Sequence, residues 1–434
     1  MKVLLIGGGG REHALAWKLR QDNPQIELIV APGNAGIAAL ARCIPIKAED
    51  LDGVLSLARG EKPDLTIVGP EGPLAAGIVD HFRASGFAVF GPTMGAAQIE
   101  TSKRFAKELM MRAGVPTAFA SVHTTVTSAK RAVAALGAPL VVKASGLAAG
   151  KGVVVAETMT QAEWAIDTML RDGAFGAAGS EVLVEEFMQG EELSVFAVCD
   201  GERAVLMRGA QDYKRLSDGD RGPNTGGMGA CAPVSLDTPG MRESIERRIF
   251  EPTLAAMREK GMPFTGLLYA GLMLTAEGPK VVEFNCRFGD PETQVLLPLL
   301  ESPLYEVMLA VARGESIAGV SPFVWKPGAS VTTVLAAPGY PSQPRLGEVI
   351  EFPAEDGGGA DDEVYVFHAG TKAVGGKAVT AGGRVLAITA VAGTVVAAAA
   401  ASRGYAERVR FPGKQMRHDI GWREVQRARG AGAS

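Results

Sequence analysis

Short apolar runs alternate with helical patterns over about the first hundred residues, and this alternation constrains the fold more than any other feature. KVLLI leads into the glycine turn and helical pattern of GGGGREHALAWKLRQ, and the later runs ELIVAP, DLTIVGP and FAVFGP each end in Gly or Pro. Helical patterns such as residues 51–59 and 74–84 lie between these runs. Since strands that alternate with helices form parallel sheets, the sequence predicts a doubly wound α/β domain here.

The glycines after the first run are also typical of dinucleotide-binding folds, but the match is poor. The G-x-G-x-x-G pattern needs a third glycine where His13 or its neighbours stand. The ribose-binding acid expected about 20 residues further on has no clear candidate after ELIV. What remains is the general tendency of anions to bind at helix N-termini, at the carboxyl ends of strands. A nucleotide-binding dehydrogenase is therefore a weak alternative.

The segment VVEFNCRFGDPETQ (residues 281–294) combines groups suited to metal and phosphate. In a strand, period-two alternation places Glu283 and Asn285 on one face. Two neighbouring oxygen-bearing side chains suit a hard cation such as Mg²⁺, and the fork of Arg287 suits phosphate or carboxylate. Further polar side chains follow in a predicted turn: Asp290, Glu292 and Gln294. A surface strand with a polar turn is the alternative.

A second segment, VVKASGLAAGKGVVV (residues 141–155), joins two strand-like runs through a loop rich in glycine and lysine. Glycines let backbone N–H groups wrap an anion, and lysine supplies a point charge. It is not a Walker A loop, because Gly152 stands where Ser or Thr would follow Lys151. We predict a hairpin whose glycine tip folds over nucleotide phosphates; an ordinary glycine-rich hairpin is the alternative.

Composition narrows the possible functions. Apolar residues make up 47% and charged residues 21% of the 434 residues, which is ordinary for a globular protein of several domains. The net charge of −4 gives no electrostatic case for nucleic acid, although a local basic cleft remains possible. No apolar run reaches the ~18 residues of a membrane span. The four scattered cysteines indicate neither zinc nor disulfides, so we expect a soluble, cytoplasmic protein.

The two polar segments together resemble the ATP-grasp superfamily, and the chain as a whole resembles the phosphoribosylamine–glycine ligase family, also called glycinamide ribonucleotide synthetases. The matching stretches run nearly from end to end. They are GGGGREHALAWKL, PGNAG, GPEGPLAAGIVD, GPTMGAAQIETSK, KASGLAAGKG, EEFMQGEELS, QDYKR, GPNTGGMGA, TGLLYAGLM, EFNCRFGDPETQ, FHAGT, TAGGRVL and RHDIGWR. One departure is Ser145, where the family usually carries Asp, and we assign it no catalytic role.

The resemblance implies an α/β and α+β multidomain fold. We expect an N-terminal Rossmann-like domain over residues 1–103 and a two-lobed ATP-grasp core over 104–325, whose small lobe covers about 122–188. A β-rich C-terminal domain should follow over 326–426. The tail, residues 427–434, reads RARGAGAS without periodicity, so we predict that it is disordered.

The resemblance also implies an activity. Enzymes of this family use ATP to join glycine to 5-phosphoribosylamine through glycyl phosphate, which yields glycinamide ribonucleotide, ADP and phosphate in de novo purine biosynthesis. Mg²⁺ or Mn²⁺ would assist, the partners would be these small molecules, and we expect a monomer. A ligase for another carboxylate, or a non-catalytic ATP-binding module, is the alternative. No protein nucleophile is needed, since positioning and electrostatics carry the chemistry.

The family pattern assigns roles to individual residues. The metal ligands would be Glu283 and Asn285. Arg287, Lys143 and Asp212 would be catalytic. ATP would contact Lys103, Lys143, Gly150, Lys151, Gly152, Glu185, Glu186, Phe187, Glu192 and Lys214. Glycine and phosphoribosylamine would contact Gly9, Arg11, Asn34, Glu71, Asp212, Pro223, Asn224, Thr225 and Arg287. Without the resemblance, Asn34 is equally a turn residue and Glu71 equally a helix cap.

Overall fold

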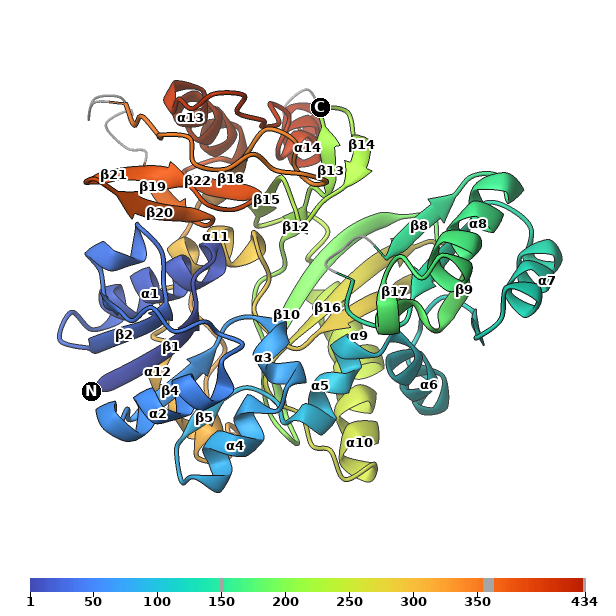
Figure 1. The fold of residues 1–434 in the computed structure, drawn as a ribbon, viewed down its shortest axis with the longest axis horizontal. Coiled ribbons are helices and arrows are strands. Elements are labelled where there is room, and N and C mark those ends of the chain that lie inside the picture. The colour runs from blue at the N-terminus through green and yellow to red at the C-terminus, as the bar shows by residue number, and fades with distance from the viewer. Residues whose placement is uncertain (149–151, 354–362, 432–434) are drawn as a thin grey trace.

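The computed structural model describes residues 1–148, 152–353 and 363–431. Figure 1 shows three packed parts around a centre, with a lobe that projects to the right. The N-terminal part lies below the C-terminal strands and helices, and the long strands of the core run from the centre towards the lobe. None of the helices described is both long and apolar enough to cross a membrane.

The N-terminal part is built on a five-stranded parallel sheet, which confirms the predicted α/β domain. The strand order is β3-β2-β1-β4-β5, so β1 lies at the centre. The strands are β1 (Lys2–Gly7), β2 (Glu27–Pro32), β3 (Arg42–Cys43), β4 (Leu65–Val68) and β5 (Val89–Phe90). The helices are α1 (Gly10–Asp22), η1 (Ile37–Ala39), α2 (Leu51–Glu61), α3 (Glu71–Ala75), α4 (Ile78–Ala84) and α5 (Met94–Thr101).

The helix expected over residues 74–84 is divided in two. Gly77 separates α3 from α4 and has a φ of +83°, a left-handed conformation that a continuous helix cannot contain. The first of the two helices, α3, begins at Glu71, shortly after the end of β4. Glu71 therefore lies at the carboxyl edge of the sheet. This position brings the Glu71 carboxylate into the centre of the molecule.

The projecting lobe is a four-stranded antiparallel sheet of order β6-β9-β7-β8. Val141 pairs with Val155 and Lys143 with Val153, which confirms the predicted hairpin. The strands are β6 (Ala120–His123), β7 (Leu140–Ala144), β8 (Val153–Ala156) and β9 (Val182–Glu186). The helices are α6 (Lys103–Ala113), which precedes the lobe, then α7 (Val126–Leu136), α8 (Met159–Ile166), η2 (Asp167–Arg171) and η3 (Gly176–Gly179).

The core of the molecule contains a second antiparallel sheet, of order β11-β10-β16-β17. Its strands are β10 (Glu191–Asp200), β11 (Ala204–Leu206), β16 (Thr265–Thr275) and β17 (Gly278–Asn285). The nearby helices are α9 (Pro239–Ile245), η4 (Glu246–Phe250), α10 (Glu251–Glu259), α11 (Glu292–Leu296), η5 (Leu297–Leu299) and α12 (Tyr305–Ala312). Strand β17 confirms the strand predicted for VVEFN.

The turn predicted to contain Glu292 and Gln294 is a helix instead. Pro291 stands immediately before α11, and Glu292 is the first helical residue. Proline is tolerated at a helix start because the N–H that it lacks has no partner there, and a first-turn carboxylate is favoured by the helix dipole. Both side chains are consequently buried, at 2% and 1% exposure, rather than free in a polar turn.

The C-terminal sheet, of order β12-β15-β18-β22-β19, takes two strands from before residue 233. These are β12 (Gln211–Asp212) and β15 (Gly229–Ala232), with the hairpin β13 (Arg215–Ser217) and β14 (Arg221–Asn224) between them. The later elements are β18 (Ala329–Ala336), β19 (Glu363–His368), β20 (Thr371–Val374), β21 (Lys377–Thr380), β22 (Arg384–Ala392), α13 (Val395–Arg408) and α14 (Trp422–Ala431). This sheet thus contains strands from both sides of the boundary expected at residue 325. The boundaries at 103, 325 and 426 stay predictions.

The prediction of a disordered tail from Arg427 is wrong as far as Ala431, because α14 continues to that residue. Arg427 donates to the Glu191 carboxylate at 2.6 Å and also pairs with Glu424. These contacts with distant residues stabilise a sequence that has no helical periodicity of its own. Residues 432–434 lie outside the described part of the chain.

Apolar packing joins the three parts at the centre. One buried cluster contains Leu4 of β1 together with Leu268 of β16 and Phe284 of β17. A second contains Val3 of β1 together with Phe367 of the C-terminal sheet. Adjacent residues of β1 thus face opposite neighbours, as strand alternation requires. Strand β1 is therefore packed between apolar residues of the other two parts.

Candidate active site

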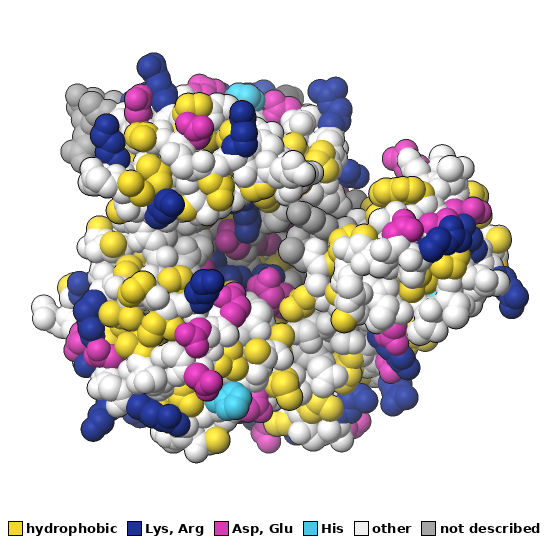
Figure 2. Space-filling model, in the orientation of Figure 1, with side chains coloured by type: hydrophobic (Ala, Val, Ile, Leu, Met, Phe, Trp, Pro, Cys, Tyr) yellow, Lys and Arg dark blue, Asp and Glu magenta, His cyan; other side chains and the backbone are white. Residues whose placement is uncertain are grey.

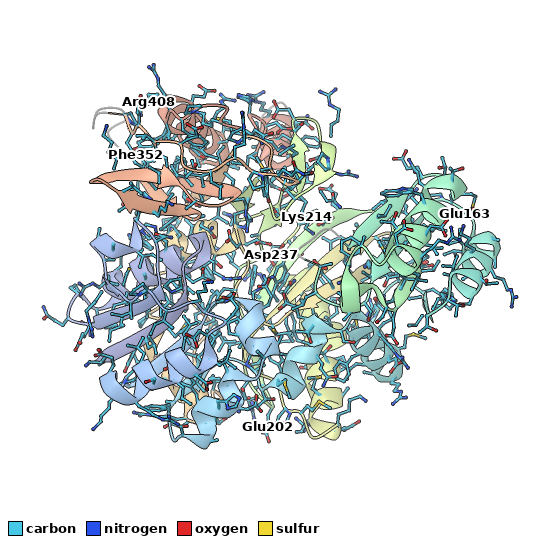
Figure 3. All side chains as sticks on the ribbon, in the orientation of Figure 1. Glu163, Glu202, Lys214, Asp237, Phe352 and Arg408 are labelled. Carbon is cyan, nitrogen blue, oxygen red and sulfur yellow. The ribbon has the colours of Figure 1, made fainter. Side chains whose placement is uncertain are left out.

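Charged side chains meet in a hollow at the centre of the molecule, where Figure 2 shows acidic and basic groups below the surface. Figure 3 labels Lys214 there, between the C-terminal strands and β10. Burial alone would raise the pKa of Glu283, but nearby cations outweigh it and lower that pKa. These cations are Lys214, Lys143, Lys103 and Arg287. We call these five residues the central charge cluster.

The metal pair proposed from the sequence lies at the end of β17. Glu283 is opposite Gly271 and Asn285 opposite Tyr269 on β16, while Phe284 between them is buried in the apolar core. Glu283 and Asn285 therefore share the face that carries the central charge cluster. Among the described residues, the structure records no ion pair or hydrogen bond for the Glu283 carboxylate, which remains free to bind a ligand.

The donor set fits a hard cation that also takes oxygens from a ligand. In the described parts of the chain, no group of three or more His, Cys, Asp or Glu side chains could hold a metal. Mg²⁺ and similar ions commonly use only one or two carboxylates plus substrate phosphates. An ionised carboxylate beside an amide oxygen meets that requirement, whereas a zinc or iron site would need more protein ligands.

Glu185 lies between two lysines at the end of β9. Its carboxylate is 2.8 Å from Lys143 Nζ and 3.2 Å from Lys107 Nζ. Burial raises the pKa of Glu185, but the two lysines outweigh this effect and lower it. Lys143 also donates to the Val282 carbonyl at 3.1 Å. Both oxygens of Glu185 are thus occupied by lysines, and the group links the projecting lobe to β17 beside the metal pair.

The base of the glycine loop is fixed to α6. The Lys103 N–H donates to the Ser145 carbonyl at 2.8 Å, and Ser145 Oγ accepts from Arg104 N–H at 3.3 Å. Lys103 Nζ donates to the Gly146 carbonyl at 3.3 Å. Ser145 thus serves backbone geometry, which agrees with its lack of an assigned role. Gly150 and Lys151, two of the loop residues predicted to bind ATP, lie outside the described residues. Gly152, the third, directly precedes β8.

Lys214 and Asp212 enter the hollow from the C-terminal sheet. Lys214 forms an ion pair with Glu192 on β10. Burial would lower the pKa of Lys214, but Glu192, Glu283 and Asp212 raise it. Burial and the nearby Glu292 carboxylate raise the pKa of Asp212 well above its ordinary value. Asp212 Oδ1 is also buried without a hydrogen-bond partner among the described residues, so this group is equipped to exchange a proton.

Arg287 is held by two carboxylates of the N-terminal part. It is 2.9 Å from Glu100 Oε1 and 3.2 Å from Glu71 Oε2. Glu100 also accepts the Cys286 N–H at 2.7 Å, so it fixes both the side chain of Arg287 and the end of β17. Burial would raise the pKa of Glu71, but Arg287 and Arg11 lower it to about 2. Glu71 and Arg287, predicted separately from the sequence, thus form one unit.

The N-terminal glycine turn is closed by its own side chains. Arg11 is 7% exposed; it pairs with Glu12 at 2.6 Å and donates to the Phe288 carbonyl at 3.0 Å. Glu12 accepts the Gly9 N–H at 2.6 Å, so two of the expected anion donors are occupied. The Arg11 guanidinium thus has protein partners, and its role as a phosphate ligand stays a prediction. Its observed contacts tie the first turn of α1 to the segment that carries Arg287.

Arg11→Ala should lower the free energy of unfolding by ~2–4 kcal/mol, because the buried Glu12 carboxylate loses its guanidinium partner. Urea unfolding measures this, with the exposed Arg59→Ala as the control. Unchanged stability, together with a KM for phosphoribosylamine raised about tenfold, would instead indicate that Arg11 binds the phosphate of that substrate directly.

Asn34 joins the N-terminal and C-terminal parts. Its Oδ1 accepts the N–H groups of Gly36 and Ile37 at 3.0 and 2.9 Å, a turn arrangement. Its Nδ2 donates to the carbonyls of Gly8 and His368 at 2.9 and 2.8 Å. The polar atoms of Asn34 therefore serve the turn and the contact between the two parts.

Several predicted residues stand outside the central charge cluster. Glu186 and Phe187 lie at the exposed end of β9, where Glu186 accepts the Phe119 N–H at 3.1 Å. Pro223 is exposed on β14. Among the described residues, no side-chain hydrogen bond links it or Asn224 to the cluster. Thr225 comes closer, since it donates to the Lys214 carbonyl at 2.8 Å and accepts the Gly227 N–H at 3.0 Å.

Further residues of the hollow were not singled out by the sequence reasoning. Glu100 holds Arg287, and Lys107 holds Glu185. Arg384 pairs with Asp290 at 3.2 Å. Tyr269 and Ser194 donate to Glu292, from Tyr269 OH at 2.6 Å and from Ser194 Oγ at 3.1 Å, whereas Glu292 itself was named as a polar residue of the predicted turn. Except for Lys107, they fall within matching stretches, such as GPTMGAAQIETSK for Glu100 and TAGGRVL for Arg384. The resemblance to the family therefore pointed to these residues, but nothing in the sequence indicated which residues they contact.

Comparison with known proteins agrees with this geometry. Models of the phosphoribosylglycinamide synthetase family match residues 1–100 as the N domain, 101–293 as the ATP-grasp (A) domain and 330–423 as the C domain. The phosphoribosylamine–glycine ligase of Xanthomonas campestris pv. campestris is 49% identical over 440 residues, which cover 100% of both chains. That of Xylella fastidiosa is 49% identical over 435 residues, or 98% of this chain and 99% of the relative.

Solved structures give the same result. The crystal structure of phosphoribosylamine–glycine ligase from Thermotoga maritima superposes with a TM-score of 0.83 at 34% identity, covering 97% of this chain and 100% of that one. The biotin carboxylase domain of Hydrogenobacter thermophilus 2-oxoglutarate carboxylase, in complex with MgADP, ADP and bicarbonate, shares the fold at 19% identity with a TM-score of 0.73. The superposition covers 96% of this chain and 91% of the biotin carboxylase chain. The chain therefore belongs to the phosphoribosylglycinamide synthetase family.

Proposed function

We propose that this protein uses ATP to ligate glycine to 5-phosphoribosylamine, which gives glycinamide ribonucleotide, ADP and phosphate in purine biosynthesis. The observation that carries the proposal is the central charge cluster, in which one ionised carboxylate on the metal-pair face is surrounded by three lysines and Arg287. Such an excess of fixed cations suits a reaction that moves phosphoryl charge. The family membership supplies the substrates.

The first step activates glycine. A carboxylate oxygen of glycine attacks the γ-phosphorus of ATP, the bond to the bridging oxygen breaks, and ADP leaves with the electron pair. Lys103 and Lys143 would neutralise charge on the α- and β-phosphates. Arg287 would hold the transferring phosphoryl group through its planar fork, since Glu100 fixes the orientation of that fork.

The second step forms the amide. The amine nitrogen of phosphoribosylamine attacks the acyl carbon of glycyl phosphate, and phosphate leaves with the electrons of the broken C–O bond. The attacking nitrogen must lose a proton. Asp212, buried beside Glu292 with one oxygen unpaired, would accept or relay that proton, because its raised pKa makes it a stronger base than an ordinary carboxylate.

Glu283 and Asn285 would hold Mg²⁺ or Mn²⁺. When bound, such an ion neutralises negative charge on the phosphates during transfer. The other nucleotide contacts in the proposal are the adenine edge at Glu185 and Phe187, with Glu186 between them, and the ribose hydroxyls at Glu192. A carboxylate suits two hydroxyl donors, which supports the last assignment. The candidates for binding the two other substrates stay Gly9, Arg11, Asn34, Glu71, Pro223, Asn224 and Thr225, besides Asp212 and Arg287.

Release of ADP, measured with each candidate acid and amine in turn, tests this function. We expect release only with ATP, glycine and phosphoribosylamine together. Glycine-independent release with another carboxylate would instead favour a ligase of different specificity, and ADP binding without turnover would favour a non-catalytic module. Gel filtration and fractionation test the monomeric state and cytoplasmic location that we also propose.

Hydrogen exchange should detect phosphate binding at the glycine loop. The described ends of that loop, Gly146 and Gly152, should exchange more slowly when a non-hydrolysable ATP analogue is added, because bound phosphates offset the entropy cost of ordering glycine. Exchange at α2 should stay constant and serves as the internal control. If the loop ends do not respond while the analogue binds, the phosphates lie elsewhere.

A further inference from the structure

Tyr213 stands between Asp212 and Lys214, which enter the hollow from the C-terminal sheet, but its own side chain faces away from the hollow. It follows Asp212 and precedes Lys214, and its side chain is 1% exposed. Its N–H donates to the Gly229 carbonyl at 2.9 Å, so the extended pairing of β12 with β15 continues through it. Strand alternation therefore presents the Tyr213 ring to the C-terminal segment.

Two arginines of that segment cover the ring. The guanidinium carbon of Arg417 lies 5.3 Å from the centre of the Tyr213 ring, and that of Arg423 lies 5.8 Å from it. Both distances fall in the range of cation–π attraction. Arg417 has no exposed side-chain surface, and it makes a bidentate pair with Asp419 at 2.7 and 2.8 Å. A buried, fully bonded guanidinium has a fixed orientation.

The same arginines hold the hairpin that follows Lys214. Arg417 donates to the Arg215 carbonyl at 3.2 Å and to Asp220 Oδ1 at 2.8 Å. Arg423 donates to Asp220 Oδ2 at 2.6 Å. One carboxylate in the β13–β14 turn thus receives both guanidinium groups, which places α14 beside this hairpin (Figure 1). The residues on both sides of Lys214 are therefore attached to the C-terminal segment, Tyr213 through its ring and Arg215 through its carbonyl.

The other half of the Glu192–Lys214 pair is attached to the same segment. Glu191, the residue before Glu192 on β10, accepts from Arg427 at 2.6 Å and lies 3.9 Å from Arg423. We call Arg417, Arg423 and Arg427 the C-terminal brace. Its three guanidinium groups span from β10 to the β13–β14 hairpin, behind the two residues whose side chains meet in the hollow.

We propose that the C-terminal brace positions Glu192 and Lys214 for the nucleotide sugar, so that residues 417–427 set nucleotide affinity without touching the nucleotide. Buried ion pairs add little stability over apolar packing, but they fix geometry through directional bonds. This inference rests on the proposed nucleotide site, in which Glu192 binds the ribose hydroxyls. A change in the brace should therefore alter recognition of the sugar.

Calorimetric titration with Mg²⁺–ADP and Mg²⁺–2′-deoxy-ADP tests the proposal. The wild type should bind ADP about tenfold more tightly than the deoxy analogue. Arg423→Leu should bind ADP about tenfold more weakly and reduce the preference to about twofold, while Arg423→Lys should lie between the two. Arg247→Ala, which removes an exposed arginine paired with Glu243 at 2.9 Å, is the control and should match the wild type.

Tyr213 supplies a second pair of variants if Arg423→Leu does not fold. Tyr213→Phe keeps the ring and should retain the sugar preference, whereas Tyr213→Leu should lose most of it. A folded Arg423→Leu or Tyr213→Leu variant that keeps the full preference would overturn the inference, as would equal binding of both sugars by the wild type. Failure of the wild type to bind ADP would instead contradict the proposed function itself.

Discussion

Glu283→Ala should reduce turnover to below about a thousandth of the wild-type rate while the protein remains folded. Glu283 supplies the only carboxylate of the proposed metal pair, and removal of a main electrostatic element of a phosphoryl-transfer site costs ~4 kcal/mol or more in the transition state. The fold should survive, because the Glu283 carboxylate has no hydrogen bond or ion pair among the described residues. Steady-state ADP release and a thermal melt measure the two effects.

Glu277→Ala is the matched control for that experiment. Glu277 precedes the same strand, is exposed, and pairs with Lys280 at 2.7 Å. Its loss should leave turnover within about twofold of the wild type, since exposed ion pairs contribute little. Binding of Mn²⁺ in the presence of ADP should be lost in Glu283→Ala and kept in Glu277→Ala. Retention of more than a tenth of the activity by Glu283→Ala would rule out the metal pair.

Local patterns predicted the elements that carry the site. The alternation of VVEFN and the two runs around the glycine loop are properties of neighbouring residues, and β17 and the β7–β8 hairpin formed as expected. The parallel N-terminal sheet follows from the same kind of signal. Strand periodicity also placed Glu283 and Asn285 on one face. The metal pair and the hairpin are thus each determined by residues that are close together in the sequence.

Contacts between distant residues could not be predicted in the same way. Nothing near Arg11 in the sequence shows that its guanidinium donates a hydrogen bond to the Phe288 carbonyl, 277 residues away. The tail looked disordered because its helix depends on Glu191, 236 residues from Arg427. Glu100 has the pattern of an ordinary helical carboxylate until β17 and Arg287 are placed beside it. In each case the missing information is the partner, which lies far away in the sequence.

Arg287→Lys should lower kcat by about a hundredfold with little change in the KM for ATP. Lysine keeps the charge but not the planar fork, so it cannot hold Glu100 and a phosphoryl group with parallel bonds. The loss of one oriented donor to developing charge is typically worth ~2.7–4 kcal/mol. Arg112→Lys on the exposed face of α6 is the control and should match the wild type.

Glu100→Gln separates the orienting role from the charge. The amide still accepts the Cys286 N–H, which Glu100 now binds at 2.7 Å, but it weakens the hold on Arg287. We therefore expect kcat to fall about tenfold in Glu100→Gln, less than in Arg287→Lys, because Arg287 itself remains. The double variant should be no slower than Arg287→Lys, since residues that act as one unit are not additive. An additive loss in the double variant would show that Glu100 acts on the reaction without Arg287.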